Sequence, residues 1–303
     1  MVQAHRIKTV AIVGCTAVGK SAIALRLARE FNGVIIGSDS MQIYRGFDIG
    51  TGKLTKSELG GVRHELIDVA DGDTPFSVGD YVELASKAIA DAHSQGKLPI
   101  ITGGTGMYVY SLFSGCNFAN TPKNDVIRTA LKLCAHIFGA DVIFSFLRAV
   151  DGESAQKIAK NDVKRVVRAL EIFAIKGEPK SAAADIKKPY DDMTIVLTLP
   201  RDMLYGRINA RVRKMFDDGL IEEAKSLAEY ADKQSMQALG YKQIISYPEM
   251  PRDELVELVA QKTRNYAKRQ ITYFKNVKLN KVFIDARDED EIFKCVKNFI
   301  GWQ

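Results

Sequence analysis

The fold is decided by the stretch Thr9-Val10-Ala11-Ile12-Val13-Gly14-Cys15-Thr16-Ala17-Val18-Gly19-Lys20-Ser21. Its first five residues are rich in β-branched side chains, which predicts a buried strand. The last eight match G-x-x-x-x-G-K-[ST], a loop whose backbone N–H groups surround phosphate oxygens. Ile23, Leu27 and Phe31 follow at four-residue spacing and predict a helix with one apolar face. A phosphate or pyrophosphate ligand is therefore expected, and a chance glycine-rich turn is the weaker alternative.

Each part of this loop has a predicted role. Lys20 reaches the outer phosphate, the Ser21 hydroxyl holds Mg²⁺, and the helix points its positive end at the anion. Backbone amides could lower the pKa of Cys15, but a small buried side chain is the favoured interpretation. The predicted phosphate-binding residues are Gly14, Cys15, Thr16, Ala17, Val18, Gly19, Lys20 and Ser21.

The composition limits the class of protein. With 303 residues, of which 46% are hydrophobic, the chain can bury a core in one large or two modest domains. No apolar run approaches the ~18 residues of a membrane span and no signal-peptide pattern opens the chain, so the cytoplasm is expected. Four scattered cysteines indicate neither disulfides nor a zinc site. The net charge of +6 is compatible with a polyanionic partner.

Two further strand ends carry candidate site residues. Residues 33–37 predict a second strand that leads into Asp39, and because parallel strands share one crevice, Asp39 is expected near the phosphate loop. Asp39 could accept a proton, bind Mg²⁺ or cap a helix. Residues 98–102 predict a third strand that ends in glycines around Thr105 instead of the acid that usually supports Mg²⁺. A plain tight turn is the alternative there.

Residues 116–189 are expected to form a helical insertion in an α/β core made of residues 1–115 and 190–303. Asp162 can cap a helix whose apolar face includes Val166 and Val167. The cations Lys164, Arg165 and Arg168 would then face solvent. Strand residues 194–199 resume the sheet.

The remaining segments suggest contacts with anions. Arg207, Arg211 and Lys214 align on one face of a helix over 204–216, where they could bind a leaving pyrophosphate. Residues 237–243 are interpreted as a contact loop rather than core. Residues 46–61 are expected to form a mobile surface loop, and His64 is expected to be structural.

The last helix, over 253–277, becomes strongly basic in its second half. Residues 262–278 contain six cations and no acid, interleaved with Tyr266, Tyr273 and Phe274. Cations bind a nucleic-acid backbone and aromatic rings stack on exposed bases, so RNA binding is favoured over a merely solvated face.

Six short motifs follow one another along nearly the whole chain: residues 14–21, 39–45, 103–106, Asn161-Asp162 with Arg165 and Arg168, 237–242, and 263–270. Together they resemble the tRNA dimethylallyltransferase family of the bacterial type. The resemblance implies a P-loop NTPase-like parallel sheet flanked by helices, with the insertion gripping the anticodon stem-loop. It also implies transfer of a dimethylallyl group from dimethylallyl diphosphate to N6 of the adenosine on the 3′ side of the anticodon.

The resemblance also implies roles for single residues. Asp39 would take the proton of the attacking N6, Thr105 would assist it, and Arg211, with Arg207, would meet the diphosphate beside Mg²⁺. A monomer is implied. The implied tRNA contacts are Asp39, Ser40, Met41, Gln42, Thr105, Arg128, Lys164, Arg165, Val166, Val167, Arg168, Gln237, Ala238, Leu239, Gly240, Tyr241, Lys242, Lys268, Arg269, Gln270, Tyr273 and Lys275.

Cys15, Val18 and Tyr273 depart from the family pattern of proline, a hydroxyl residue and tryptophan. Two other functions remain open. A small-molecule kinase would use the same loop and an acid, but would not need the basic helix. A nucleotide-gated RNA-binding protein would not need Asp39 and Thr105 beside the loop.

Overall fold

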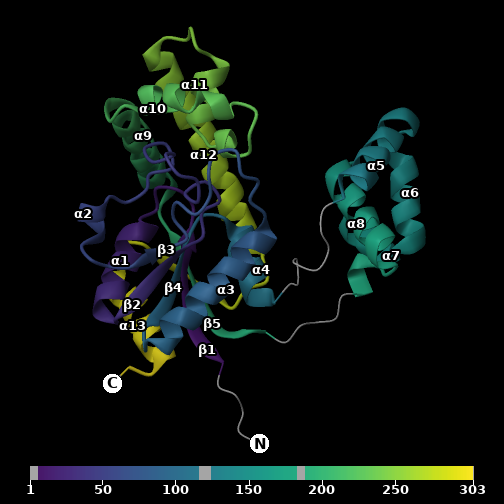
Figure 1. Cartoon of the computed structure of the whole chain (residues 1–303). Coiled ribbons are helices and arrows are strands. Elements are labelled where there is room, and N and C mark those ends of the chain that lie inside the picture. Colours follow the sequence, from purple (N-terminus) through teal and green to yellow (C-terminus); the bar gives the residue numbers. More distant parts are fainter. Residues whose placement is uncertain (1–5, 116–123, 183–187, 303) are drawn as a thin grey trace, which may run out of the picture. The chain divides into compact units, whose positions relative to one another are not determined.

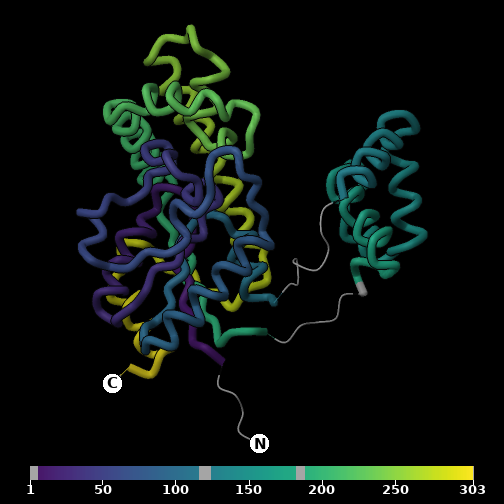
Figure 2. The backbone as a smooth tube through the Cα atoms, viewed as in Figure 1, coloured from purple at the N-terminus to yellow at the C-terminus, as the bar shows by residue number. Residues whose placement is uncertain are grey.

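A computed structural model of the chain describes residues 6–115, 124–182 and 188–302, and Cys116 lies outside these ranges. The chain divides into two compact units, residues 1–116 with 188–303 and residues 117–187. In Figure 2, the tube of the first unit is purple, blue, green and yellow, and that of the second unit is teal. In the described ranges, no helix is both long and apolar enough to span a bilayer.

Six parallel strands form the sheet of the first unit, in the order β3-β2-β4-β1-β5-β6. The central strand β1 pairs with β4 on one side and with β5 on the other, so that Ala11 lies between Ile101 and Thr194. The predicted parallel sheet flanked by helices is confirmed. The strands are β1 Ile7–Gly14, β2 Gly33–Gly37, β3 His64–Glu65, β4 Leu98–Gly103, β5 Tyr190–Thr198 and β6 Lys281–Asp285.

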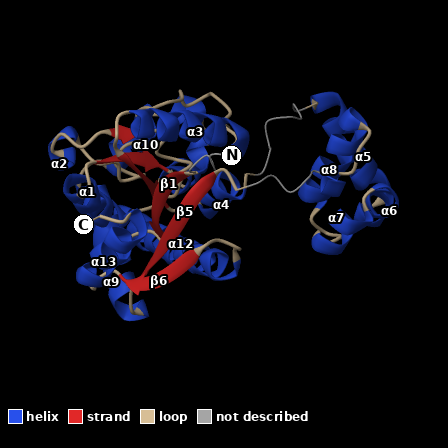
Figure 3. Ribbon diagram, turned by 90° about the horizontal axis from the view of Figure 1, so that it is seen from below, coloured by secondary structure: helices blue, strands red, loops and turns tan. Residues whose placement is uncertain are grey.

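Helices cover both faces of this sheet, with α1 and α13 on one side and α3 and α4 on the other (Figure 3). The α-helices of the first unit are α1 Lys20–Glu30, α2 Lys56–Leu59, α3 Val78–Ser94, α4 Gly106–Ser114, α9 Arg201–Asp217, α10 Leu220–Ser226, α11 Tyr241–Ser246, α12 Arg252–Asn276 and α13 Glu289–Ile300. Two 3₁₀ turns, Ala228–Tyr230 and Ser235–Gln237, connect α10 to α11.

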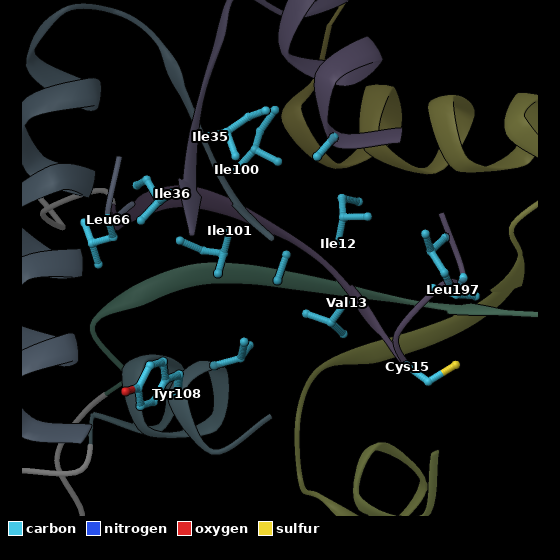
Figure 4. Packing of buried hydrophobic residues seen from close by; sticks show 14 of the residues in the cluster. Ile12, Val13, Cys15, Ile35, Ile36, Leu66, Ile100, Ile101, Tyr108 and Leu197 are labelled. Atoms are coloured by element: carbon cyan, nitrogen blue, oxygen red, sulfur yellow. The ribbon is translucent and has the colours of Figure 1, made fainter. Parts of the chain in front are cut away.

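The central strands are buried on both faces. Ile12, Ile36 and Ile101 are inaccessible to solvent, and Figure 4 shows them among the packed side chains of the core. Parallel strands that are covered on both sides have continuous apolar sequences, which is why the pattern predicted them. This core fixes where β1, β2 and β4 end, and therefore fixes the loops that follow them.

Some predictions for the first unit need correction. The edge strands β3 and β6 lie outside the predicted set, because an edge strand is short and half exposed, as Phe283 is at 46%. Residues 46–61 were expected to form a surface loop, and residues 55–58, 60 and 61 are exposed, but the first part of the segment is anchored. Phe47 is fully buried, and the Lys53 ammonium pairs with Asp48 at 2.7 Å and Asp68 at 2.5 Å.

The second unit is helical and has its own apolar core, which includes Ile143, Leu147, Val166 and Val167. Asp162 accepts a hydrogen bond from the N–H of Arg165 and caps α8, as predicted. Val166 and Val167 are at most 3% exposed, so their expected contact with RNA is wrong. The helices are α5 Asp125–Phe138, α6 Ala140–Val150, α7 Gly152–Lys157 and α8 Val163–Lys176, with a 3₁₀ turn at Lys180–Ala182.

Candidate functional site

The phosphate loop joins β1 to α1. Gly14 has a φ of 146°, and a Cβ there would lie 2.8 Å from the Leu197 carbonyl oxygen, so only glycine fits. Gly19, with φ of 111°, precedes the first residue of α1, Lys20. Cys15 is 3% exposed, and burial raises the pKa of its thiol, which agrees with a small buried side chain rather than a reactive one.

Lys20 is partly buried at the base of this loop. Its ammonium donates a hydrogen bond to the Cys15 carbonyl at 2.8 Å. Burial lowers the pKa of Lys20 to about 8, and the guanidinium of Arg211 acts in the same direction, whereas Asp39 opposes them. An anion bound beside this partly desolvated ammonium would favour its charged form.

Asp39 and Thr105 lie on neighbouring loops, because β2 and β4 pair with each other. Asp39 Oδ1 accepts the N–H of Met41 at 3.0 Å and therefore closes its own turn instead of capping a helix. Thr105 Oγ1 accepts the N–H of Ser40 at 3.0 Å and donates to Ser40 Oγ at 3.2 Å. The two loops are thus joined at the candidate base.

The glycines around Thr105 are required by close packing. A Cβ on Gly103 would lie 2.3 Å from the Ser38 backbone, and one on Gly106 would lie 2.4 Å from the Tyr273 ring. On Gly104 it would lie 2.3 Å from Gln270 Nε2. This segment is therefore more than a tight turn, although what approaches it is protein.

Gln270 is a buried brace between two loops. Its Oε1 accepts the N–H of Thr16 at 2.9 Å, and its Nε2 donates to the Gly104 carbonyl at 2.9 Å. Gln270 is 6% exposed, so the tRNA contact that the resemblance implies for it does not lie on the exposed face of the helix.

Of the three cations predicted on α9, two reach the site. Arg211 donates to the Thr51 carbonyl at 3.2 Å, and burial lowers the pKa of its guanidinium, with Asp39 opposing this shift. Arg207 donates to the Val18 carbonyl at 3.4 Å. Lys214 is 76% exposed and pairs with Asp218, so its predicted role at the site is wrong.

Two cavities meet at this point. The larger, of about 280 Å³, has an apolar wall made by Val212, Met215, Leu239 and Val259. The smaller, of about 80 Å³, is polar. Five residues line both cavities: Thr16, Asp39, Thr51, Arg211 and Tyr266.

The smaller cavity has the chemistry of a diphosphate site. Lys20, Ser21 and Gln42 line it, and oxygen ligands for Mg²⁺ are present in the Ser21 hydroxyl and the Asp39 carboxylate. Within the described ranges, no three His, Cys, Asp or Glu residues cluster as a metal site. His64 also lines this cavity, and burial lowers its pKa to about 4.

The basic helix α12 has one exposed face. Lys262, Lys268, Arg269 and Lys275 are exposed on this helix, and so is Lys278 just beyond its end. Phe274 is fully buried, and Tyr273 is partly buried against Gly106. The Arg269 guanidinium stacks over the Tyr266 ring at 5.5 Å. The predicted mixture of cations and aromatics on the surface is therefore correct for the cations and for part of the rings.

Residues 237–243 are core as much as surface. Gln237 and Lys242 are exposed and bond to each other at 2.9 Å. Gly240 and Tyr241 are buried, so the interpretation of this segment as a contact loop outside the core is wrong for them. Ala238 is also buried, but it lines the larger cavity beside Gln237. Three other predicted contact residues, Ser40, Met41 and Leu239, line the larger cavity.

In the second unit, the predicted cations differ in their surroundings. Lys164 and Arg165 are exposed, and Arg165 pairs with Asp162 at 3.3 Å. Arg128 and Arg168 both pair with Glu171, which is fully buried, at 2.9 and 2.6 Å. Arg168 therefore does not face solvent as freely as predicted.

The sequence did not point to Thr51 or Glu223 as contributors to this site, and for Tyr241 the resemblance implied a contact with tRNA instead of the role that it has here. Thr51 supplies a carbonyl to Arg211, while Glu223 and Tyr241 hold the segment that carries Thr51. Backbone carbonyls have no sequence signal, and Glu223 resembles any acid in the first turn of a helix.

Comparison with known proteins gives one family. Residues 42–277 match the model of the IPP transferase family. The tRNA dimethylallyltransferases of Thermoanaerobacter sp. (strain X514) and Halalkalibacterium halodurans are each 40% identical; the alignments cover 97% of this chain and 98% and 96% of the two relatives.

Solved structures that are similar to this chain point to the same family. The tRNA isopentenylpyrophosphate transferase of Bacillus halodurans is 38% identical with a TM-score of 0.73, and 97% of each chain is covered. A eukaryotic dimethylallyltransferase acting on tRNA is 28% identical with a TM-score of 0.86, covering 97% of this chain and 80% of that one. Similarity of this extent, over a sheet edge that carries the phosphate loop, Asp39 and Thr105, means that this chain belongs to the IPP transferase family of tRNA-modifying prenyltransferases.

Proposed function

We propose that this protein transfers a dimethylallyl group from dimethylallyl diphosphate to N6 of the adenosine on the 3′ side of a tRNA anticodon and releases diphosphate. The observation that carries the proposal is the position of Asp39 where a polar cavity beside the phosphate loop meets a larger cavity with an apolar wall. One substrate with a charged end and an apolar end fits such a pair of cavities.

The diphosphate would occupy the smaller cavity. The backbone of the phosphate loop, Lys20 and Arg211 would neutralise the charge that grows on the leaving oxygen, and such stabilisation is often the largest part of catalysis. The Ser21 hydroxyl would hold Mg²⁺, which when bound would supply further positive charge at the diphosphate. The loop would thus grip an anion without hydrolysing ATP.

The adenine would enter the larger cavity, and it must leave its stack to do so. Its N6 attacks the allylic carbon, the carbon–oxygen bond to the diphosphate breaks, and the N6 proton passes to the Asp39 carboxylate. An exocyclic amine is a weak nucleophile, so a fixed base and correct placement are what these residues can contribute. Thr105, bonded to Ser40, would hold the base or the bridging oxygen.

Two surfaces would bind the RNA. One is the exposed cationic face of α12, with Lys268, Arg269 and Lys275. The other belongs to the helical insertion, residues 116–189, where Lys164, Arg165 and Arg128 are candidates for contacts with the anticodon stem-loop. Because one chain lines both cavities, we infer that a monomer is sufficient, and a tRNA substrate favours the cytoplasm.

The test is incubation of the protein and Mg²⁺ with radiolabelled dimethylallyl diphosphate and an anticodon stem-loop whose anticodon is followed by adenosines, with labelled ATP in a parallel reaction. Label that moves from the prenyl donor to the RNA is the expected result. Consumption of ATP alone would replace the proposal with a kinase or a nucleotide-gated RNA-binding protein.

A further inference from the structure

Residues 48–52 form a wall of both cavities, and this segment is called the wall loop below. Gly50 and Thr51 line the larger cavity, whereas Thr51 and Gly52 line the smaller one. The Thr51 carbonyl accepts hydrogen bonds from Arg211 at 3.2 Å and from Gln42 at 3.1 Å. The position of this carbonyl therefore determines how the Arg211 guanidinium is oriented, and this is the group expected to bind the diphosphate.

The wall loop is held from outside by one carboxylate. Glu223, on α10, accepts the backbone N–H groups of Asp48 at 3.3 Å, Ile49 at 3.0 Å and Gly50 at 3.3 Å. The Tyr241 hydroxyl donates to the same carboxylate and accepts the Gly50 N–H at 3.0 Å. Hydrogen bonds to an ionised acceptor are roughly twice as strong as neutral ones, so four donors on Glu223 make a firm anchor.

Close packing makes the position of the loop specific. Tyr241 is fully buried, and a Cβ on Gly50 would lie 2.3 Å from its ring. Gly52 has a φ of 64°, and a Cβ there would lie 2.1 Å from Arg211 Nη2. A small displacement of the wall loop would therefore move the guanidinium of Arg211.

We propose that Glu223 and Tyr241 are a positioning pair, which fixes the wall loop and through the Thr51 carbonyl holds Arg211 in the direction that binds diphosphate. Neither residue lines either cavity, so both act through the loop. The proposal rests on the proposed function only in that it takes the anion beside Arg211 to be the diphosphate of the prenyl donor.

The test compares Glu223→Gln and Tyr241→Phe with a matched control, Glu222→Gln, an exposed acid that precedes Glu223 on the same helix. The measurements are the Kd of inorganic diphosphate with Mg²⁺ by calorimetry, the kcat and KM for the prenyl donor, and the Kd of the stem-loop. In Glu223→Gln, the amide keeps one acceptor and turns an NH₂ group toward the N–H donors. We expect diphosphate binding and kcat/KM to weaken by roughly tenfold or more, the usual worth of a hydrogen bond to a charged group.

Stem-loop affinity should stay the same in both variants, and Glu222→Gln should match the wild type. A second comparison repeats Glu223→Gln in an Arg211→Lys background, which keeps the charge but loses the planar donor. Residues that act through one network are not additive, so Glu223→Gln should then have little further effect.

Additive losses, or a lowered melting temperature with unchanged diphosphate affinity, would overturn the proposal. If the wild type transfers no prenyl group, the proposed function fails, and diphosphate affinity alone decides the role of Glu223.

Discussion

Asp39 has two oxygens with different tasks. Oδ1 holds the turn by accepting the Met41 N–H, which leaves Oδ2 for the substrate amine. Asp39→Asn keeps an acceptor for that turn but removes the base. We expect single-turnover prenyl transfer to fall by about 100-fold or more, the usual contribution of a general base, while the Kd of the stem-loop stays nearly unchanged. A variant with near-normal turnover would remove the base from the mechanism.

Lys20 gives the site a pH dependence whose sign follows from its pKa of about 8 in the free protein. A bound diphosphate favours the charged amine and raises that pKa. Above pH 8 the free amine is neutral, so binding must take up a proton. The Kd of the prenyl donor should therefore rise up to about tenfold per pH unit above 8. Calorimetry between pH 7 and 9.5 measures this. The control is Lys20→Met, which should bind the prenyl donor weakly and lose the part of the pH dependence that Lys20 causes. A Kd of the wild type that does not change with pH would contradict the contact between Lys20 and the diphosphate.

At the scale of elements, α12 has a buried face and an exposed face with different side chains. Its buried face carries Gln270, which braces the phosphate loop, and its exposed face carries Lys268 and Arg269. Replacing both cations with Gln should weaken stem-loop binding and reduce the slope of log K against log salt by about one per lost phosphate contact. The matched control is Lys294→Gln with Lys297→Gln on α13, which are also exposed. Equal salt slopes in the two double variants would exclude α12 as an RNA surface.

The elements also explain what the sequence can predict. Buried runs such as Val10 to Val13 and the residues after each strand define β1, β2, β4 and their loops, because burial on both faces leaves a continuous apolar signal. The edge strand β6 lacks that signal. Glu223 could not be predicted as part of the site, and Gln270 was expected as a tRNA contact rather than as a brace. Their partners, Ile49 and Thr16, lie 174 and 254 residues away in sequence. Periodicity identifies a face of a helix but not what it will meet.

The whole molecule has two separate cores, which predicts that one unit can be loosened without the other. Leu147 is fully buried in the second unit, and Leu147→Ala should cost about 2–5 kcal/mol of stability there. Both cavities lie in the first unit, so the Kd of inorganic diphosphate should not change. Stem-loop affinity should fall, because the cations on α5 and α8 lose their fixed places.

Hydrogen exchange read by mass spectrometry separates these outcomes. Protection should decrease in peptides from 125–176 and stay unchanged in β1, β4 and α12. Ile12→Val, a milder change at a fully buried position of the first unit, is the reciprocal control and should lower protection in the sheet alone. Loss of protection throughout the chain from Leu147→Ala would mean that the two units unfold as one. In that case, RNA binding by the insertion could not be assigned separately from the catalytic core.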